Sequence, residues 1–138
     1  PDGLYGLAAG AVDISVPIVG SEPVSVSRGE PGFWIGEAAI LADTRRTVSV
    51  CAIQPSTLVF VPGNKLVARL RQRPEWWQPF YELSQTNTTL AINLLAEVLA
   101  LSPRARIARL LLRVADDSGV INGRKEDLGR LIGLPSLM

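Results

Sequence analysis

The chain has 138 residues, and 47% of them are hydrophobic, which is enough to bury a sizeable core. Its formal net charge of +1 indicates neither a nucleic acid nor a membrane as partner, although residues 103–138 hold seven Lys/Arg and four Asp/Glu. One cysteine and no histidine exclude an internal disulfide and a Ser-His-Asp or Cys-His site, and we expect neither an enzyme nor a metal protein. No apolar run reaches the roughly 18–20 residues of a membrane span, and the cysteine usage fits a reducing, cytoplasmic compartment.

Residues 4–61 are predicted to be rich in β-strands. Apolar and polar residues alternate in AVDISVPIV, PVSVSR and RTVSVCAI, and TLVFVP is a short apolar run closed by Pro62. Short strands separated by Gly and Pro turns are typical of an all-β roll or barrel. We interpret Cys51 as a core residue of this roll and Trp34 as part of its packing. GEAAILAD breaks the alternation and predicts one helical turn after Gly36.

A helical period begins near residue 63. GNKLVARLRQR predicts a short helix with Asn64 as its N-cap, Pro74 interrupts the chain, and Trp76 and Trp77 are expected to anchor the start of a longer helix. After Ser102-Pro103, RARIARLLLRVADD predicts another helix. KEDLGRLIG, with a turn after it, has the outline of a helix-turn-helix.

The long helix, over residues 80–101, carries two apolar stripes. A helix with two stripes needs two partners, which could be the roll and a second copy of the same helix in a coiled-coil dimer. One long helix lying on a single core is the alternative. In the dimer, Asn87 would help to fix the register. The first stripe contains Leu83, Leu90, Leu94 and Leu101, with the polar residues Asn87 and Glu97 at intervening positions. The second stripe contains Ala91, Leu95 and Val98.

The order of these segments resembles the Crp–Fnr superfamily of bacterial transcription regulators. The resemblance rests on YGLAAGAVDISVP, PGFWIGEAAIL, RRTVSV and RIARLLLRVAD with KEDLGRLIGL, and extends over nearly the whole chain. It implies an α+β chain with a cyclic-nucleotide-binding-type β-roll (jelly-roll-like) at 1–73, a long dimerisation helix at 74–102 and the start of a winged helix-turn-helix at 103–138. It also implies that further strands precede Pro1 and that a recognition helix follows about Ser136, so we expect a fragment of a longer protein.

The resemblance further implies a phosphate-binding cassette within GFWIGEAAILADTRRTVSV. Small residues let the backbone approach a ligand, and free N–H groups at a helix start bind an anion. An arginine can hold a cyclic phosphate with its planar guanidinium, and a carboxylate accepts a hydrogen bond from a ribose hydroxyl. The residues expected to bind ligand are Gly36, Glu37, Ala38, Ala39, Arg46 and Thr47, with Arg46 on the phosphate.

Two alternatives concern the charged groups of this cassette. Arg45 replaces Arg46 as the phosphate arginine if the loop register shifts by one, and otherwise it is a solvated loop residue beside Asp43. Glu37 and Arg46 could also pair with each other in an empty pocket, since family members exist that keep the roll without a nucleotide.

Cyclic AMP is one candidate effector, but the base contacts depart from the family pattern. The residues that align with the adenine-contacting hydroxyl pair of cAMP-dependent members are Ala91 and Ile92, whose side chains neither donate nor accept. Thr88 and Thr89 lie nearby on the helix and are the candidate base contacts, with Asn93 as a further substitute.

The resemblance implies a DNA-binding regulator that senses a small effector and acts as a homodimer through residues 80–101. Arg124, Lys125 and Arg130 would contact the DNA backbone, whereas Arg104 and Arg109 are expected on a solvated helix face. The alternative is a stand-alone cyclic-nucleotide-binding or protein-interaction module without DNA binding.

Overall fold

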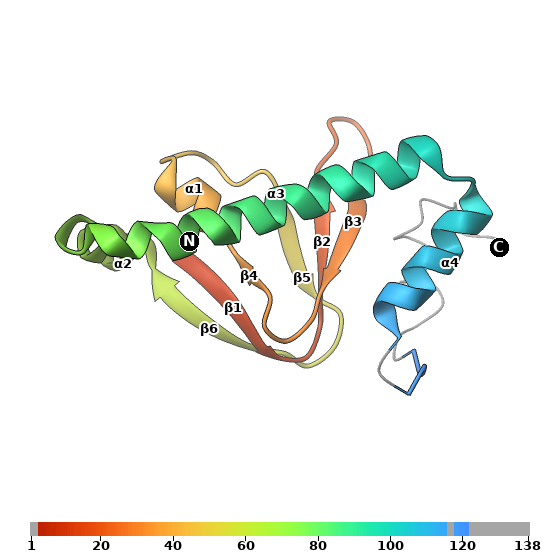
Figure 1. Ribbon diagram of the computed structural model, residues 1–138, viewed down its shortest axis with the longest axis horizontal. Coiled ribbons are helices and arrows are strands. Elements are labelled where there is room, and N and C mark those ends of the chain that lie inside the picture. Colours follow the sequence, from red (N-terminus) through yellow and green to blue (C-terminus); the bar gives the residue numbers. More distant parts are fainter. Residues whose placement is uncertain (1–2, 116–117, 122–138) are drawn as a thin grey trace.

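The computed structural model describes residues 3–115 and 118–121 and contains two three-stranded antiparallel sheets (Figure 1). The first has the order β4-β1-β6, with β1 at Gly3–Ala9, β4 at Trp34–Ile35 and β6 at Thr57–Pro62. The second has the order β3-β2-β5, with β2 at Val12–Val16, β3 at Val24–Gly29 and β5 at Ser49–Ala52. The predicted β-roll, with its short strands and intervening turns, is therefore confirmed.

Consecutive strands β1 and β2 belong to different sheets, and Gly10 makes the corner between them. Its φ of 93° is a backbone conformation that L side chains rarely adopt. A Cβ there would lie 2.3 Å from Ser56 Oγ. That hydroxyl donates to Ala11 O and accepts from Ala11 N, both at 3.2 Å, so it fastens the corner to the start of β6.

Helices cover one side of the roll and extend beyond it (Figure 1). They are α1 at Glu37–Leu41, α2 at Gly63–Gln72, the 3-10 turn η1 at Pro74–Trp76, α3 at Trp77–Ala100 and α4 at Pro103–Val114. Helix α3 crosses the whole roll, as the predicted long helix should. None of the helices among residues 3–115 is long and apolar enough to cross a membrane.

The N-cap of α2 differs from the sequence-based prediction. Helix α2 begins at Gly63 with Pro62 as N-cap, and the Asn64 Oδ1 accepts a hydrogen bond only from the adjacent Lys65 N–H, at 2.8 Å. Asn64 already lies inside the first turn and therefore does not cap the helix. Ser102 does cap a helix, since its side chain accepts from Ala105 N at 3.4 Å at the start of α4.

The core lies where β1, α2 and the start of α3 meet. Leu4, Leu66 and Leu70 are buried there, with Leu70 completely inaccessible. Trp34 packs against this cluster, as predicted, and so do Ile40 and Leu41 of α1 and Phe80 and Leu83 of α3. The same cluster thus holds α1 against α3.

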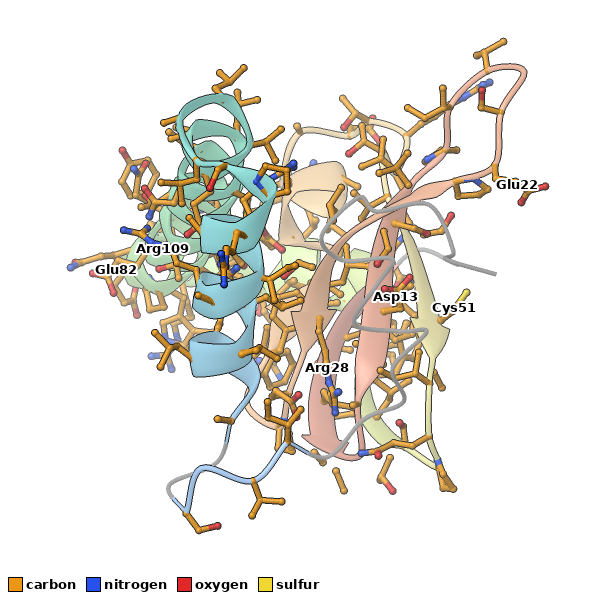
Figure 2. All side chains as sticks on the ribbon, turned by 90° about the vertical axis from the view of Figure 1, so that its right-hand side faces the viewer. Asp13, Glu22, Arg28, Cys51, Glu82 and Arg109 are labelled. Atoms are coloured by element: carbon orange, nitrogen blue, oxygen red, sulfur yellow. The ribbon has the colours of Figure 1, made fainter. Side chains whose placement is uncertain are left out.

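Cys51 is exposed, which contradicts its predicted place in the core. All four residues of β5 are exposed, and β5 is an edge strand that pairs only with β2 among the described strands. Figure 2 shows the Cys51 side chain pointing outward from this edge. Alternation in RTVSVCAI identifies a strand but does not determine whether either of its faces is covered.

The two apolar stripes of α3 have different surroundings. Every member of the first stripe, from Leu83 to Leu101, is partly buried. The second stripe is less covered, since Ala91 is exposed and Leu95 and Val98 are exposed by more than half. The neighbouring Ile92 and Leu99 are also exposed by more than half. The first stripe therefore packs on the roll, whereas the second stripe and its apolar neighbours are largely exposed in the described chain.

Helix α4 is tied to α3 by a three-residue ion-pair cluster. The Glu97 carboxyl lies 3.2 Å from Arg109 Nη1 and 3.3 Å from Arg113 Nη2. The Glu97 side chain is only 15% exposed, so solvent screens this cluster less than an ordinary surface pair. Arg109, predicted to be simply solvated, is thus an ion-pair partner, whereas Arg104 is exposed as expected.

Candidate functional site

Helix α1 begins where the backbone of Gly36 lies close to the β1 backbone and to the Arg46 side chain. Gly36 has a φ of 111°, and a Cβ at this position would lie 2.7 Å from the carbonyl oxygen of Gly3 and 3.0 Å from Arg46 Nη1. Only glycine fits here, because any side chain would have to displace both the β1 backbone and the guanidinium. The glycine therefore lets the start of α1, strand β1 and Arg46 lie against one another.

Glu37, the first residue of α1, is 3% exposed and hydrogen-bonded to the long helix. Its Oε1 accepts from Asn87 Nδ2 at 3.0 Å, and the same amide lies 3.3 Å from Trp34 O. The Asn87 amide therefore joins α3 to α1 inside the chain, and its role in fixing the register of a dimer stays a prediction. A buried carboxyl needs such a donor, since an unpaired one would cost free energy on burial.

Arg46 lies on the other side of Gly36. Its Nη2 donates to the carbonyl oxygen of Gly3, and its Cζ lies 5.2 Å from the centroid of the Tyr5 ring. Among the described residues no ion pair joins Arg46 to Glu37, so the alternative in which these two pair is wrong. The residue remains exposed, and this hydrogen bond uses only one of the five N–H donors of its side chain.

These residues open onto a cavity of about 730 Å³ between the roll and α3. The volume is within the usual range for small-molecule sites. All six residues expected to bind ligand line it, together with Arg45 and Thr88. Thr89 is not among its lining residues, and the Thr89 hydroxyl instead accepts from Gln85 Nε2 at 3.4 Å.

Several residues of the cavity were not predicted. Asn87 was predicted as a polar residue within an apolar stripe. Its partner, Glu37 on α1, is more than forty residues away in sequence. Arg106, Leu110 and Arg113 of α4 also line the cavity, and no local pattern indicates that α4 returns to it. The predicted DNA-backbone residues Arg124, Lys125 and Arg130 lie outside the described residues.

Comparison with known families agrees with this geometry. The family model described as "Cyclic nucleotide-binding domain" matches residues 1–73, just over half of the chain. The chain belongs to this family. No curated protein sequence matches the chain.

Solved structures of Crp/Fnr-type regulators share the fold of this cyclic-nucleotide-binding-type chain at low identity. FixK2 from Bradyrhizobium japonicum superposes with a TM-score of 0.84 at 15% identity, over 96% of this chain and 68% of that one. The c-di-GMP responsive global regulator CLP of Xanthomonas campestris superposes with a TM-score of 0.73 at 18% identity, over 98% of this chain and 72% of that one. The catabolite activator protein of Thermus thermophilus superposes with a TM-score of 0.53 at 22% identity, over 97% of this chain and 64% of that one. The chain thus spans about two thirds of each of these regulators.

Proposed function

We propose that the chain is the effector-sensing part of a Crp–Fnr-type transcription regulator. The observation that carries the proposal is the cavity between the roll and α3, whose lining includes the buried Glu37 and the exposed Arg45 and Arg46. The cassette, with one carboxyl, two cations and adjacent small residues, suits a small anionic group that is joined to hydroxyls. The family membership supports the same class of ligand.

A cyclic nucleotide is the effector we propose to test first. Arg46 would hold the phosphate, and the Gly3 carbonyl and the Tyr5 ring keep its guanidinium next to Gly36. Glu37 would accept from a ribose hydroxyl through the carboxyl oxygen that Asn87 does not use. Of the candidate base contacts, Thr88 lines the cavity, so it is the residue we expect to contact a base.

The proposed mechanism is a population shift carried by α3. Because Asn87 joins α3 to Glu37, a ligand that hydrogen-bonds Glu37 acts on the long helix directly. In this division residues 1–73 sense, 74–102 transmit and dimerise, and 103–138 begin a DNA-binding domain with Arg124, Lys125 and Arg130 on DNA phosphates. The alternative proposal is a stand-alone binding module, which would not bind DNA. The family is one of regulatory domains, and we propose a cytoplasmic regulator without catalytic activity.

Calorimetric titration of cAMP and cGMP into the wild-type chain and Arg46→Ala tests the proposal. We expect micromolar binding of at least one nucleotide and a loss of about 1.5–3 kcal/mol in the variant, roughly ten- to a hundredfold, as for a charge-assisted hydrogen bond. Arg104→Ala, an exposed arginine outside the cavity, is the control and should change affinity less than about threefold, because long-range charge alone is screened. Equal affinity of wild type and Arg46→Ala for both nucleotides would contradict the assigned role of Arg46.

We also propose a homodimer through residues 80–101, formed by the exposed apolar face of α3 around Ile92, Leu95 and Leu99. Its apolar side chains, among them Leu95 and Leu99, are 58% and 77% exposed and form a continuous helical face. Sedimentation should show a dimer at tens of micromolar, and Leu95→Glu should be monomeric. Gln85→Glu, on the same helix outside both apolar stripes, is the control and should remain dimeric. A wild-type monomer would exclude this interface.

A further inference from the structure

The cavity is elongated along α3 and has two chemically distinct ends. At one end lies the cassette, where Asn87 contacts Glu37. At the other end lies α4, which folds back at the end of α3 (Figure 1) and pairs with Glu97. Ten residues separate Asn87 from Glu97, which corresponds to about 15 Å along a helix. Because both residues line the cavity, a ligand that fills it is long rather than round.

Most of the side chains between the two ends are apolar. Leu90, Leu94 and Val98 face the cavity from α3, and Val24 and Phe33 face it from the roll. Such a surface gains free energy by covering an apolar body and offers few partners to the polar edge of a nucleobase. The middle of the cavity therefore favours a hydrocarbon or aromatic segment.

The α4 end carries an excess of positive charge. Glu97 is already paired with Arg109 and Arg113, so its charge is compensated within the cluster. Arg106 lines the same end, is half-buried, and forms no ion pair with a described residue. Its Nε is buried and has no hydrogen-bond partner in the described part of the chain. A buried, unpaired donor on a cation is costly, and an anionic ligand group would satisfy it.

We infer that the effector is an elongated molecule with an anionic group at each end and an apolar middle, held by Arg46 at the cassette and by Arg106 on α4. This inference rests on the effector-sensing role proposed above, and it names a class of effector different from the cyclic nucleotide. Such a ligand touches the roll, α3 and α4 together. Its binding would therefore fix the position of α4 directly, in addition to acting through Asn87.

Dodecanedioate is a suitable probe, since it has a carboxylate at each end of a long apolar chain. Calorimetry on the 138-residue chain would compare it with dodecanoate, which lacks the second carboxylate, and with hexanedioate, which is too short to reach both ends. We expect dodecanedioate to bind at least about tenfold more tightly than dodecanoate or hexanedioate, because it adds one charge-assisted contact. Arg106→Gln should abolish this advantage over dodecanoate. Arg104→Gln, an exposed position of the same helix outside the cavity, should retain it.

The outcomes separate this inference from the function on which it rests. Equal affinities for dodecanedioate and dodecanoate, absence of dodecanedioate binding, or an unchanged preference in Arg106→Gln would each overturn the second anion contact. If cyclic nucleotides still bind in an Arg46-dependent way, the proposed function survives such a result. Arg106→Gln could instead remove the preference for dodecanedioate over dodecanoate while Arg46→Ala changes no affinity. That result would support the contact with Arg106 and contradict the role assigned to Arg46.

Discussion

Leu70→Ala is expected to lower the free energy of unfolding by about 2–5 kcal/mol, the range for truncating a buried leucine. Leu70 is completely inaccessible and lies in the cluster with Leu4 and Leu66 against which α1 and α3 pack. The surrounding elements come from four parts of the chain and can only partly close the resulting cavity. Urea denaturation followed by circular dichroism measures the change.

Leu112→Ala is the matched control for this substitution. Leu112 lies on α4 and is 81% exposed, so its truncation should change the free energy of unfolding by no more than about 0.5 kcal/mol. Similar denaturation midpoints for the two variants would show that the cluster around Leu70 is not the core that positions α1.

Asn87→Leu is expected to destabilise the chain by about 1–3 kcal/mol, because it leaves the buried Glu37 carboxyl without its donor. The two side chains are similar in size, so the change removes the hydrogen bonds to Glu37 and Trp34 rather than packing volume. Asn93→Leu, an exposed position on the same helix, is the control and should be close to neutral.

A double variant tests the reason for this effect. In Glu37→Leu/Asn87→Leu both polar partners are gone, so no buried group is left unsatisfied, and the double variant should be more stable than Asn87→Leu alone. If the double variant is the less stable of the two, the Asn87 effect comes from packing and not from the Glu37 carboxyl. Chemical denaturation of the four proteins completes the thermodynamic cycle.

The sequence predicts the strands and helices well, because their signals are local. Alternation in residues 12–16, the apolar run at 57–62 and the helical period after residue 63 correspond to β2, β6, α2 and α3. Burial is predicted less well. Cys51 is in the strand that its pattern indicates, yet it is exposed, since burial depends on which elements cover β5.

The site was predicted where residues close in sequence form it, and missed where the tertiary fold forms it. Gly36 to Thr47 lie within a dozen residues, and all the expected cassette positions line one cavity. The bond between Asn87 and Glu37 and the return of Arg106 to the cavity depend on how α3 and α4 cross the roll. Neither has a signal in the spacing of the residues involved.

Amide hydrogen exchange with and without saturating cAMP tests the central claim most directly. We expect slower exchange in residues 36–47 and 84–98, the cassette and the part of α3 that line the cavity, because ligand contacts there suppress local opening. Exchange in the exposed edge strand β5 should be unchanged. If cAMP leaves both segments unaltered, or protects only residues away from the cavity, the assignment of this cavity as a cyclic-nucleotide site is contradicted.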